Sequence, residues 1–222
     1  SNVGMVKIMQ NLQPSIYWDW LKKLGIDSQL RTDLFESTAG HIKTKDIFVT
    51  QSIEPAVASF GKGFSISPLK LAQLHAVLAN GGIEVTPHVT SNFKESLNKH
   101  SGKRLFSNDV SKTVLEWMES VVESGSGIGA KIDGYRIAGK TGTSQKARNG
   151  VYTSQKVCSF VATLPANNPK YIVLVVVDEP SKSYAYGSTV AVPVAKEIIE
   201  SLIVIEKIPP QLIEDQVIVK KP

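Results

Sequence analysis

The chain has 222 residues, of which 42% are hydrophobic and 20% charged, and its formal net charge is +5 at neutral pH. These values are typical of a globular protein with a core of ordinary size. They exclude a membrane span within the chain, because no apolar run reaches about 18 residues. They also argue against nucleic-acid binding, because the lysines are scattered singly rather than gathered with aromatic residues. The single cysteine, Cys158, excludes an internal disulfide.

The first part of the chain predicts two short helices followed by an irregular region. Apolar spacing favours helices over residues 3–12 and 15–24, divided by Pro14 and ended by Gly25. Residues 26–66 carry few periodic signals, and we expect loops with short strands there.

Two longer helices follow, each with a clear start signal. Ser67 and Pro68 begin a helix over residues 67–80, with Leu71, Leu74 and Leu78 on one face and Gly81-Gly82 as its stop. Ser107 begins a second helix over residues 107–123. Its predicted inner face consists of Val110, Val114, Trp117 and Val121.

The last third predicts three strands and a final helix. Strand patterns occur over residues 135–145, 156–164 and 171–178, and short connections favour an antiparallel meander. The run 172–177 is apolar throughout, so we expect it to be covered on both faces. Residues 188–204 predict a helix with Pro193 near its first turn, and the Pro-broken tail 207–222 is expected to be peripheral.

The stretch "RIAGKTGTSQK" (136–146) is unusual for a strand, because glycine weakens a strand unless something approaches its backbone closely. A peptide can pair with such a bare strand. Lys140 and the hydroxyls of Thr141 and Thr143 could hold a carboxylate, and a backbone N–H could stabilise an oxyanion. The alternative is an ordinary surface strand beside a turn.

Four stretches in chain order resemble one known family: "SNVGMVKI", "SFGKGFSISPLKLAQLHAVLANGG", "GYRIAGKTGTSQK" with "GVYTSQK", and "YIVLVVVDEPSKSYAYGSTVAVPVA". The sequence is similar to the class B high-molecular-weight penicillin-binding proteins, the D,D-transpeptidases, and most closely to the septal subclass. The second stretch distinguishes them from β-lactamases and small carboxypeptidases. The resemblance implies an α+β fold of the serine β-lactamase/transpeptidase type, with an antiparallel sheet covered by helices. It further implies that only the C-terminal half of the domain is present, over residues 1–206.

The resemblance also assigns roles to individual residues. Lys140 would hold the substrate carboxylate and support proton transfer, and the amide of Thr143 would form one side of the oxyanion hole. Thr141 and Thr143 would bind the carboxylate beside Gly142, whose lack of a side chain admits the substrate. Asn2 would match the Asn of the Ser-x-Asn motif; alternatively, Ser1-Asn2 are remnants of a tag and the match is accidental.

Two tyrosines match aromatic residues of the family's substrate cleft. Tyr152 follows the Lys-Thr-Gly strand, and Tyr186 precedes the final helix. Ala185 departs from the pattern, because the septal subclass often has a second aromatic residue there. Ordinary loop packing is the alternative for both tyrosines.

The family's nucleophile is a serine with a lysine one helical turn later. Ser-x-x-Lys occurs here at Ser59–Lys62, Ser67–Lys70, Ser91–Lys94 and Ser96–Lys99. None precedes the Ser-x-Asn position as the motif order requires, and helix capping explains Ser67. We therefore expect the nucleophile upstream of residue 1 and an isolated chain that is inactive.

The implied reaction is cross-linking of peptidoglycan stem peptides at division, with a D-Ala-D-Ala substrate and β-lactams as mimics. It needs no metal or organic cofactor, and the four histidines show no metal spacing. In the full-length protein the resemblance implies an N-terminal membrane anchor, a periplasmic position outside the bacterial cytoplasmic membrane, and divisome partner proteins. Uncovered faces of the half-domain predict self-association. The alternatives are a carboxypeptidase or β-lactamase of the same fold, or a non-catalytic penicillin-sensing domain.

Overall fold

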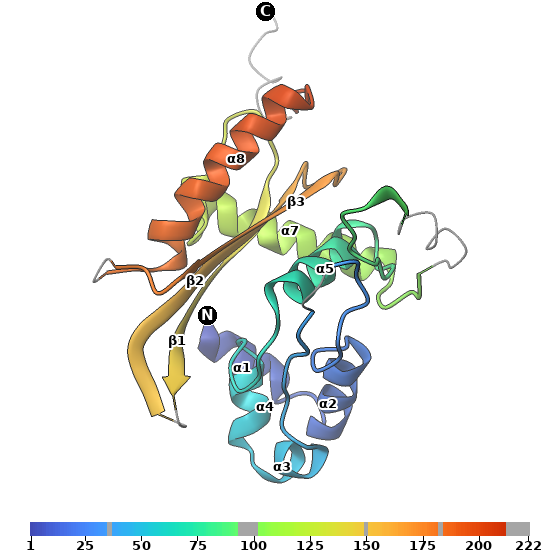
Figure 1. The fold of residues 1–222 in the computed structure, drawn as a ribbon. Coiled ribbons are helices and arrows are strands. Elements are labelled where there is room, and N and C mark those ends of the chain that lie inside the picture. Colours follow the sequence, from blue (N-terminus) through green and yellow to red (C-terminus); the bar gives the residue numbers. More distant parts are fainter. Residues whose placement is uncertain (35–36, 93–101, 149–150, 182–183, 212–222) are drawn as a thin grey trace, which may run out of the picture. The chain divides into compact units, whose positions relative to one another are not determined.

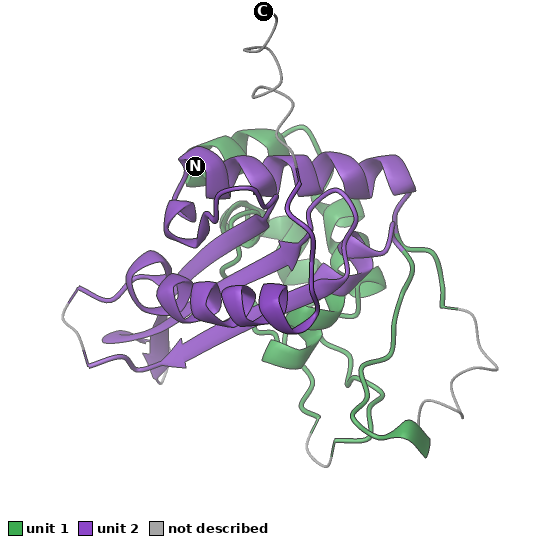
Figure 2. Ribbon diagram, turned by 90° about the horizontal axis from the view of Figure 1, so that it is seen from above, with its two compact units in different colours: residues 1–74, 83–105 green, residues 75–82, 106–222 purple. Residues whose placement is uncertain are grey.

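The computed structural model describes residues 1–34, 37–92, 102–148, 151–181 and 184–211. These residues form two units, shown in different colours in Figure 2. Unit 1 comprises residues 1–74 and 83–105, and unit 2 comprises residues 75–82 and 106–222. In the described residues no helix is long and apolar enough to cross a membrane.

Unit 1 is built from short helices (Figure 1). They are α1 (Asn2–Met9), α2 (Pro14–Lys23), α3 (Lys45–Thr50), α4 (Ile53–Ala58) and the first half of α5 (Pro68–Ala79). Its core includes Leu21, Ile42 and Phe48, and the Tyr17 ring meets Phe48 edge-on with centroids 5.7 Å apart. The two predicted N-terminal helices are confirmed. The expectation of loops over 26–66 is wrong at α3 and α4, whose six residues each are too few to show a helical period.

Helix α5 confirms the predicted start, because the Lys70 amide donates to the Ser67 hydroxyl at 3.2 Å. The apolar face predicted for this helix is not its most buried face. Leu71, Leu74 and Leu78 are half-buried, whereas the buried residues of α5 are Lys70, Gln73 and Val77.

Unit 2 is a three-stranded antiparallel sheet with helices on both faces. Its strands β1 (Ala138–Arg148), β2 (Val151–Leu164) and β3 (Tyr171–Asp178) lie in the order β1-β2-β3, which confirms the meander. One face carries Phe160, Ala162 and Val173, which pack with Val192, Ala195 and Ile199 of α8 (Val192–Ile205). The other face carries Ala138 and Val161, which pack with Leu115 and Met118 of α7 (Asn108–Ser124).

Helix α7 has the predicted N-cap, since the Val110 amide donates to the Ser107 hydroxyl at 3.2 Å. The predicted inner face is wrong by one residue. Ser111, Leu115, Met118 and Val122 are buried, while Trp117 is 66% exposed. The two stripes are adjacent and both largely apolar, so the periodicity defines the helix without defining which stripe faces the sheet.

Strand β3 is covered on both faces along most of its length, as predicted. Val173, Val175 and Val177 pack on the α8 side, and Ile172 and Leu174 on the α7 side. Val176, near the end of the strand, is 37% exposed and departs from the prediction. The final helix is confirmed with Pro193 in its first turn, preceded by the π-helical turn η2 (Gly187–Ala191).

The boundary between a domain over 1–206 and a tail over 207–222 stays a prediction. Ile208, beyond that boundary, is buried in the core of unit 2, and the Tyr135 hydroxyl donates to its carbonyl. The part of the predicted tail over residues 212–222 lies outside the described residues.

Candidate functional site

The Lys-Thr-Gly segment lies in β1, at the edge of the sheet. In the described residues β1 pairs only with β2, so its second edge carries backbone groups without a neighbouring strand. Gly139 keeps this segment close to the core, because a Cβ there would lie 2.6 Å from the Phe160 ring. The strand is therefore fixed on one edge and open on the other, as pairing with an extended peptide requires.

The two threonines of this segment lie on one face of β1 and Lys140 on the other. Side chains alternate along a strand. Thr141 and Thr143 oppose Phe160 and Cys158, on the α8 face, while Lys140 opposes Val161, on the α7 face. The sequence-based expectation that these residues share one strand is confirmed. The alternation brings the two hydroxyls together.

Both threonine hydroxyls have hydrogen-bond partners from outside the sheet. The amide of Gly187, the first residue of η2, donates to Thr143 Oγ1 at 3.0 Å. Thr141 Oγ1 lies 2.6 Å from Ser126 Oγ, and either atom could donate. The threonines are thereby oriented by two separate loops.

Lys140 projects from the surface beside its own strand. Its Nζ donates to the Thr141 carbonyl at 2.8 Å. The residue as a whole is exposed to solvent. The protein around its ammonium group nevertheless removes enough water from that group to lower the pKa of Lys140. A cation that is partly stripped of water binds a carboxylate more strongly than a fully hydrated one, and it gives up a proton more readily.

Gly187 is held against β1 by backbone contact. A Cβ at Gly187 would lie 2.5 Å from the Ser159 carbonyl oxygen and 2.6 Å from that of Gly142. Only glycine permits this approach, because the obstructing atoms belong to the backbone. The turn that follows Tyr186 therefore packs closely against the backbone of the Lys-Thr-Gly segment.

Tyr186 lies immediately before this turn. The residue is 49% exposed, and Lys156 Nζ lies 4.6 Å from the centroid of its ring and donates to the Ala185 carbonyl at 3.2 Å. Cation–π contact with Lys156 therefore orients the ring. Tyr186 is one residue from Gly187, whose amide is bound to Thr143.

Tyr152 occupies a different position, at the far end of the β1–β2 hairpin. It is 59% exposed and opposes Ala147, four positions along β1 from Thr143. At about 3.3 Å per residue this is roughly 13 Å from the threonine. The hairpin end on which it lies is held by Lys146, whose Nζ forms ion pairs with Asp178 and Glu179.

Asn2 is the first residue of α1 and is exposed, and the Ser1 hydroxyl caps this helix by accepting from the Gly4 amide. It belongs to unit 1, whereas Lys140 and Thr143 belong to unit 2. The pairing of Asn2 with the Lys-Thr-Gly segment stays a prediction.

Two of the chain's own Ser-x-x-Lys matches, Ser59–Lys62 and Ser67–Lys70, are described in full, and the serine of each makes a structural contact. Ser67 caps α5, and Lys70 Nζ is bound to Gln73 Oε1 at 2.8 Å. Ser59 Oγ donates to the Ala56 carbonyl. Lys94, Ser96 and Lys99 lie outside the described residues.

Three residues of the site were not predicted from the sequence: Ser126, Lys156 and Gly187. Ser126 lies in the glycine-rich loop "GSGIG", which lacks the strand–helix context of a phosphate-binding loop. Its actual contact, with a strand 15 residues later, leaves no local signal.

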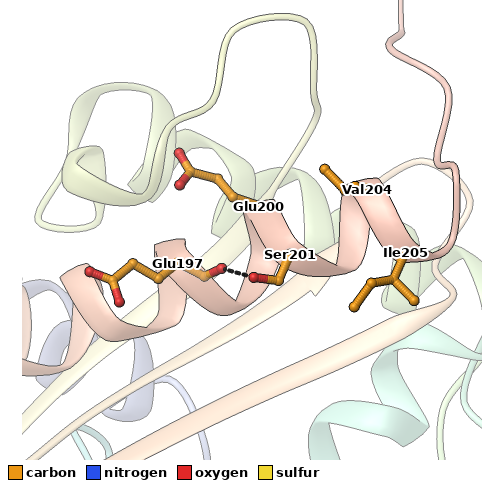
Figure 3. A pocket seen from close by; sticks show the side chains of 5 residues that line it. All are labelled: Glu197, Glu200, Ser201, Val204 and Ile205. Atoms are coloured by element: carbon orange, nitrogen blue, oxygen red, sulfur yellow. Dashed lines mark hydrogen bonds between the residues drawn. The ribbon is translucent and has the colours of Figure 1, made fainter.

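A surface hollow on α8 is lined by none of the candidate site residues. Figure 3 shows its five lining side chains, which all come from that one helix: Glu197, Glu200, Ser201, Val204 and Ile205. Ser201 Oγ is bound to the Glu197 carbonyl at 2.9 Å. Walls from a single helix make an open surface groove rather than an enclosed site.

Comparison with known proteins identifies the family. The model of the penicillin-binding protein transpeptidase domain matches residues 1–200, and the chain belongs to this family. Together with the relatives and solved structures that follow, this match confirms the class B resemblance and the fold class.

Relatives of known name agree. The chain is 42% identical to the peptidoglycan D,D-transpeptidase FtsI homolog of Mesostigma viride, over 96% of this chain and 39% of that protein. It is 37% identical to the probable peptidoglycan D,D-transpeptidase PenA of Neisseria flavescens, over 89% of this chain and 48% of that protein. The chain therefore spans less than half the length of these relatives.

A solved structure has the same fold. The transpeptidase domain of penicillin-binding protein 3 from Burkholderia pseudomallei is 28% identical, with a TM-score of 0.84, over 96% of this chain and 64% of that one. Penicillin-binding protein 3 of Mycobacterium tuberculosis, solved in complex with ampicillin, is 26% identical with a TM-score of 0.81, over 96% and 51%.

Proposed function

We propose that this chain is part of a peptidoglycan D,D-transpeptidase and supplies the strand that binds the substrate's terminal carboxylate. The observation that carries the proposal is the edge strand β1. It combines an open backbone, a partly desolvated Lys140 and two hydroxyls, those of Thr141 and Thr143, on one face. The family membership and the D,D-transpeptidase relatives support the same reaction.

In the proposed reaction a serine attacks the carbonyl of the penultimate D-Ala. An ester forms between the serine oxygen and that carbonyl, the D-Ala–D-Ala amide bond breaks, and terminal D-Ala leaves as an amine that takes up a proton. An acceptor amine from a neighbouring stem peptide then attacks the ester and forms the cross-link, and the serine recovers its proton.

This chain's residues would act on binding and charge. Lys140, Thr141 and Thr143 would hold the carboxylate of the terminal D-Ala, and the Thr143 amide would donate to the oxyanion. Gly142 would admit the peptide backbone. Tyr186 would form a wall of the cleft, and Tyr152 would contact a more distant part of the substrate. Asn2 would bind the substrate amide.

The nucleophile is proposed to come from a Ser-x-x-Lys motif elsewhere in the whole protein. The capping role of Ser67 and the buried partner of Lys70 support this, because both groups of that match are already engaged. Action outside the cytoplasmic membrane, an N-terminal anchor and divisome partners belong to the same proposal. β-Lactams would acylate the enzyme as substrate mimics, in keeping with the ampicillin complex of the mycobacterial relative.

The test is a product assay on the whole protein, given a peptide ending in D-Ala-D-Ala and an acceptor amine. The proposal predicts release of D-Ala together with the cross-linked amide. Hydrolysed peptide as the sole product would instead identify a carboxypeptidase. Absence of any acyl-enzyme would indicate a non-catalytic domain.

A further inference from the structure

The Ser126 hydroxyl comes from outside the Lys-Thr-Gly motif and contacts the threonine of that motif. The residue stands between α7 and the one-turn helix η1 (Ile128–Ala130), and its Oγ lies 2.6 Å from Thr141 Oγ1. The loop is well fixed. The Gly127 amide donates to the Val121 carbonyl at 3.0 Å, and a Cβ at Gly127 would lie 3.3 Å from the Phe160 ring.

The protons of these hydroxyls can be counted. Ser126 and Thr141 carry two, and whichever residue donates, one is used within the pair and one remains for another acceptor. Thr143 accepts from the Gly187 amide, so its own proton also remains. Two donor protons are therefore available from one face of β1, which matches the two oxygens of a carboxylate.

A competing acceptor for the Thr143 proton is the thiol of Cys158, its partner in the register. Burial raises the pKa of this thiol, so it stays neutral at physiological pH. A neutral sulfur is a weak acceptor compared with a carboxylate oxygen. An arriving anion would therefore take the proton.

The Ser126–Thr141 hydrogen bond is expected to contribute little to the stability of the fold. Ser126 is exposed, and a hydrogen bond between accessible hydroxyls replaces bonds to water at small net gain. Its geometric effect is more specific, because a free threonine hydroxyl rotates among its staggered positions. A fixed neighbour limits that rotation.

We infer that Ser126 is a positioning residue of the carboxylate site, which holds the Thr141 hydroxyl so that the spare proton of the pair is directed to the anion. The inference rests on the proposed function of the Lys-Thr-Gly strand. It extends the site to the loop after α7, and it concerns selectivity for a ligand with a free carboxylate over the same ligand without one.

The experiment measures acylation of the whole protein by benzylpenicillin and by its carboxyl methyl ester. The readout is the ratio of the two second-order rate constants. Ser126→Ala and Ser126→Gly remove the hydroxyl, the latter with least demand on the glycine-rich turn. Ser126→Thr keeps it. Ser124→Ala is the matched control, because Ser124 is an exposed neighbour whose hydroxyl is bound to the Ser120 carbonyl within α7.

We expect Ser126→Ala and Ser126→Gly to lower the acid-to-ester ratio about 5- to 10-fold, as for loss of one oriented hydrogen bond to an anion. Ser126→Thr should retain it within about 2-fold, and Ser124→Ala should leave it unchanged. Equal slowing of acid and ester, or an unchanged ratio in both hydroxyl-free variants, would overturn the inference while leaving the proposed function intact. Absence of acylation in the unsubstituted protein would overturn the proposed function itself.

Discussion

Lys70 and Lys140 each have a pKa lowered by desolvation, and each belongs to a motif-like pattern, yet their surroundings differ. Lys70 is 6% exposed, its Nζ is bound to Gln73 Oε1 at 2.8 Å, and Ser67 in the same pattern caps α5. Lys140 is exposed, and its Nζ is bound to the carbonyl of the adjacent Thr141.

A shifted pKa therefore does not by itself identify a functional lysine. Lys70 is enclosed: the Gly25 backbone stands so close that a Cβ there would lie 3.0 Å from the ammonium nitrogen. Gln73 is itself held by the Val85 carbonyl at 2.6 Å. An ammonium group surrounded in this way has a structural role, whereas Lys140 can exchange its partner for a ligand.

The largest expected effect separates the two lysines by activity. Lys140→Ala in the whole protein should lower the rate constant for acylation by benzylpenicillin on the order of 100-fold, because it removes a charge-assisted contact to the ligand's carboxylate. Lys112→Ala, at an exposed position on α7, serves as the control and should leave the rate unchanged. A loss below about 3-fold for Lys140→Ala would contradict the proposal that Lys140 binds the ligand's carboxylate.

The second effect separates the two lysines by stability. Lys70→Ala should lower the free energy of unfolding by about 2 kcal/mol, because it opens a cavity and leaves a buried amide oxygen without its donor. Urea unfolding of the whole protein measures this. The acylation rate of the folded variant should stay within about 2-fold of the original, and a much larger loss would give Lys70 a functional role.

The same variant has a predictable pH dependence. Because the folded-state pKa of Lys70 lies below its ordinary value of 10.5, the unfolded state binds more protons between these two values, and this lysine's contribution to stability rises with pH. The loss in free energy of unfolding caused by Lys70→Ala, relative to the unsubstituted protein, should therefore be larger at about pH 9.5 than at about pH 7. Tyr17, whose pKa burial raises to about 12, has the opposite trend but is present in both proteins and cancels. A deficit that shrinks with pH would contradict the assignment.

The smallest expected effect concerns Ser67. Ser67→Ala should cost about 1 kcal/mol of stability through loss of the α5 cap, with little change in acylation rate. Ser67→Asp should recover most of that stability, because aspartate caps helices as well as serine does. A cap variant that folds normally yet loses acylation would give Ser67 a role in the chemistry.

The features that depend on local sequence pattern could be predicted from the sequence. The three strands, the α7 cap at Ser107 and the Lys-Thr-Gly segment all carry signals within a few residues. The features that depend on distant contacts could not: α7's buried stripe, set by packing on Ala138 and Val161, and the burial of Lys70. The Ser126–Thr141 contact belongs to the second kind, since it forms only when the loop after α7 folds back on β1.

The most direct test is to locate the penicilloyl adduct by peptide mass spectrometry of the whole protein after treatment with benzylpenicillin. We expect an adduct on the serine of a Ser-x-x-Lys motif outside residues 1–222, with the peptide containing Ser67 unmodified. An adduct on Ser67 would contradict it, because the residue assigned to capping α5 would then be the nucleophile.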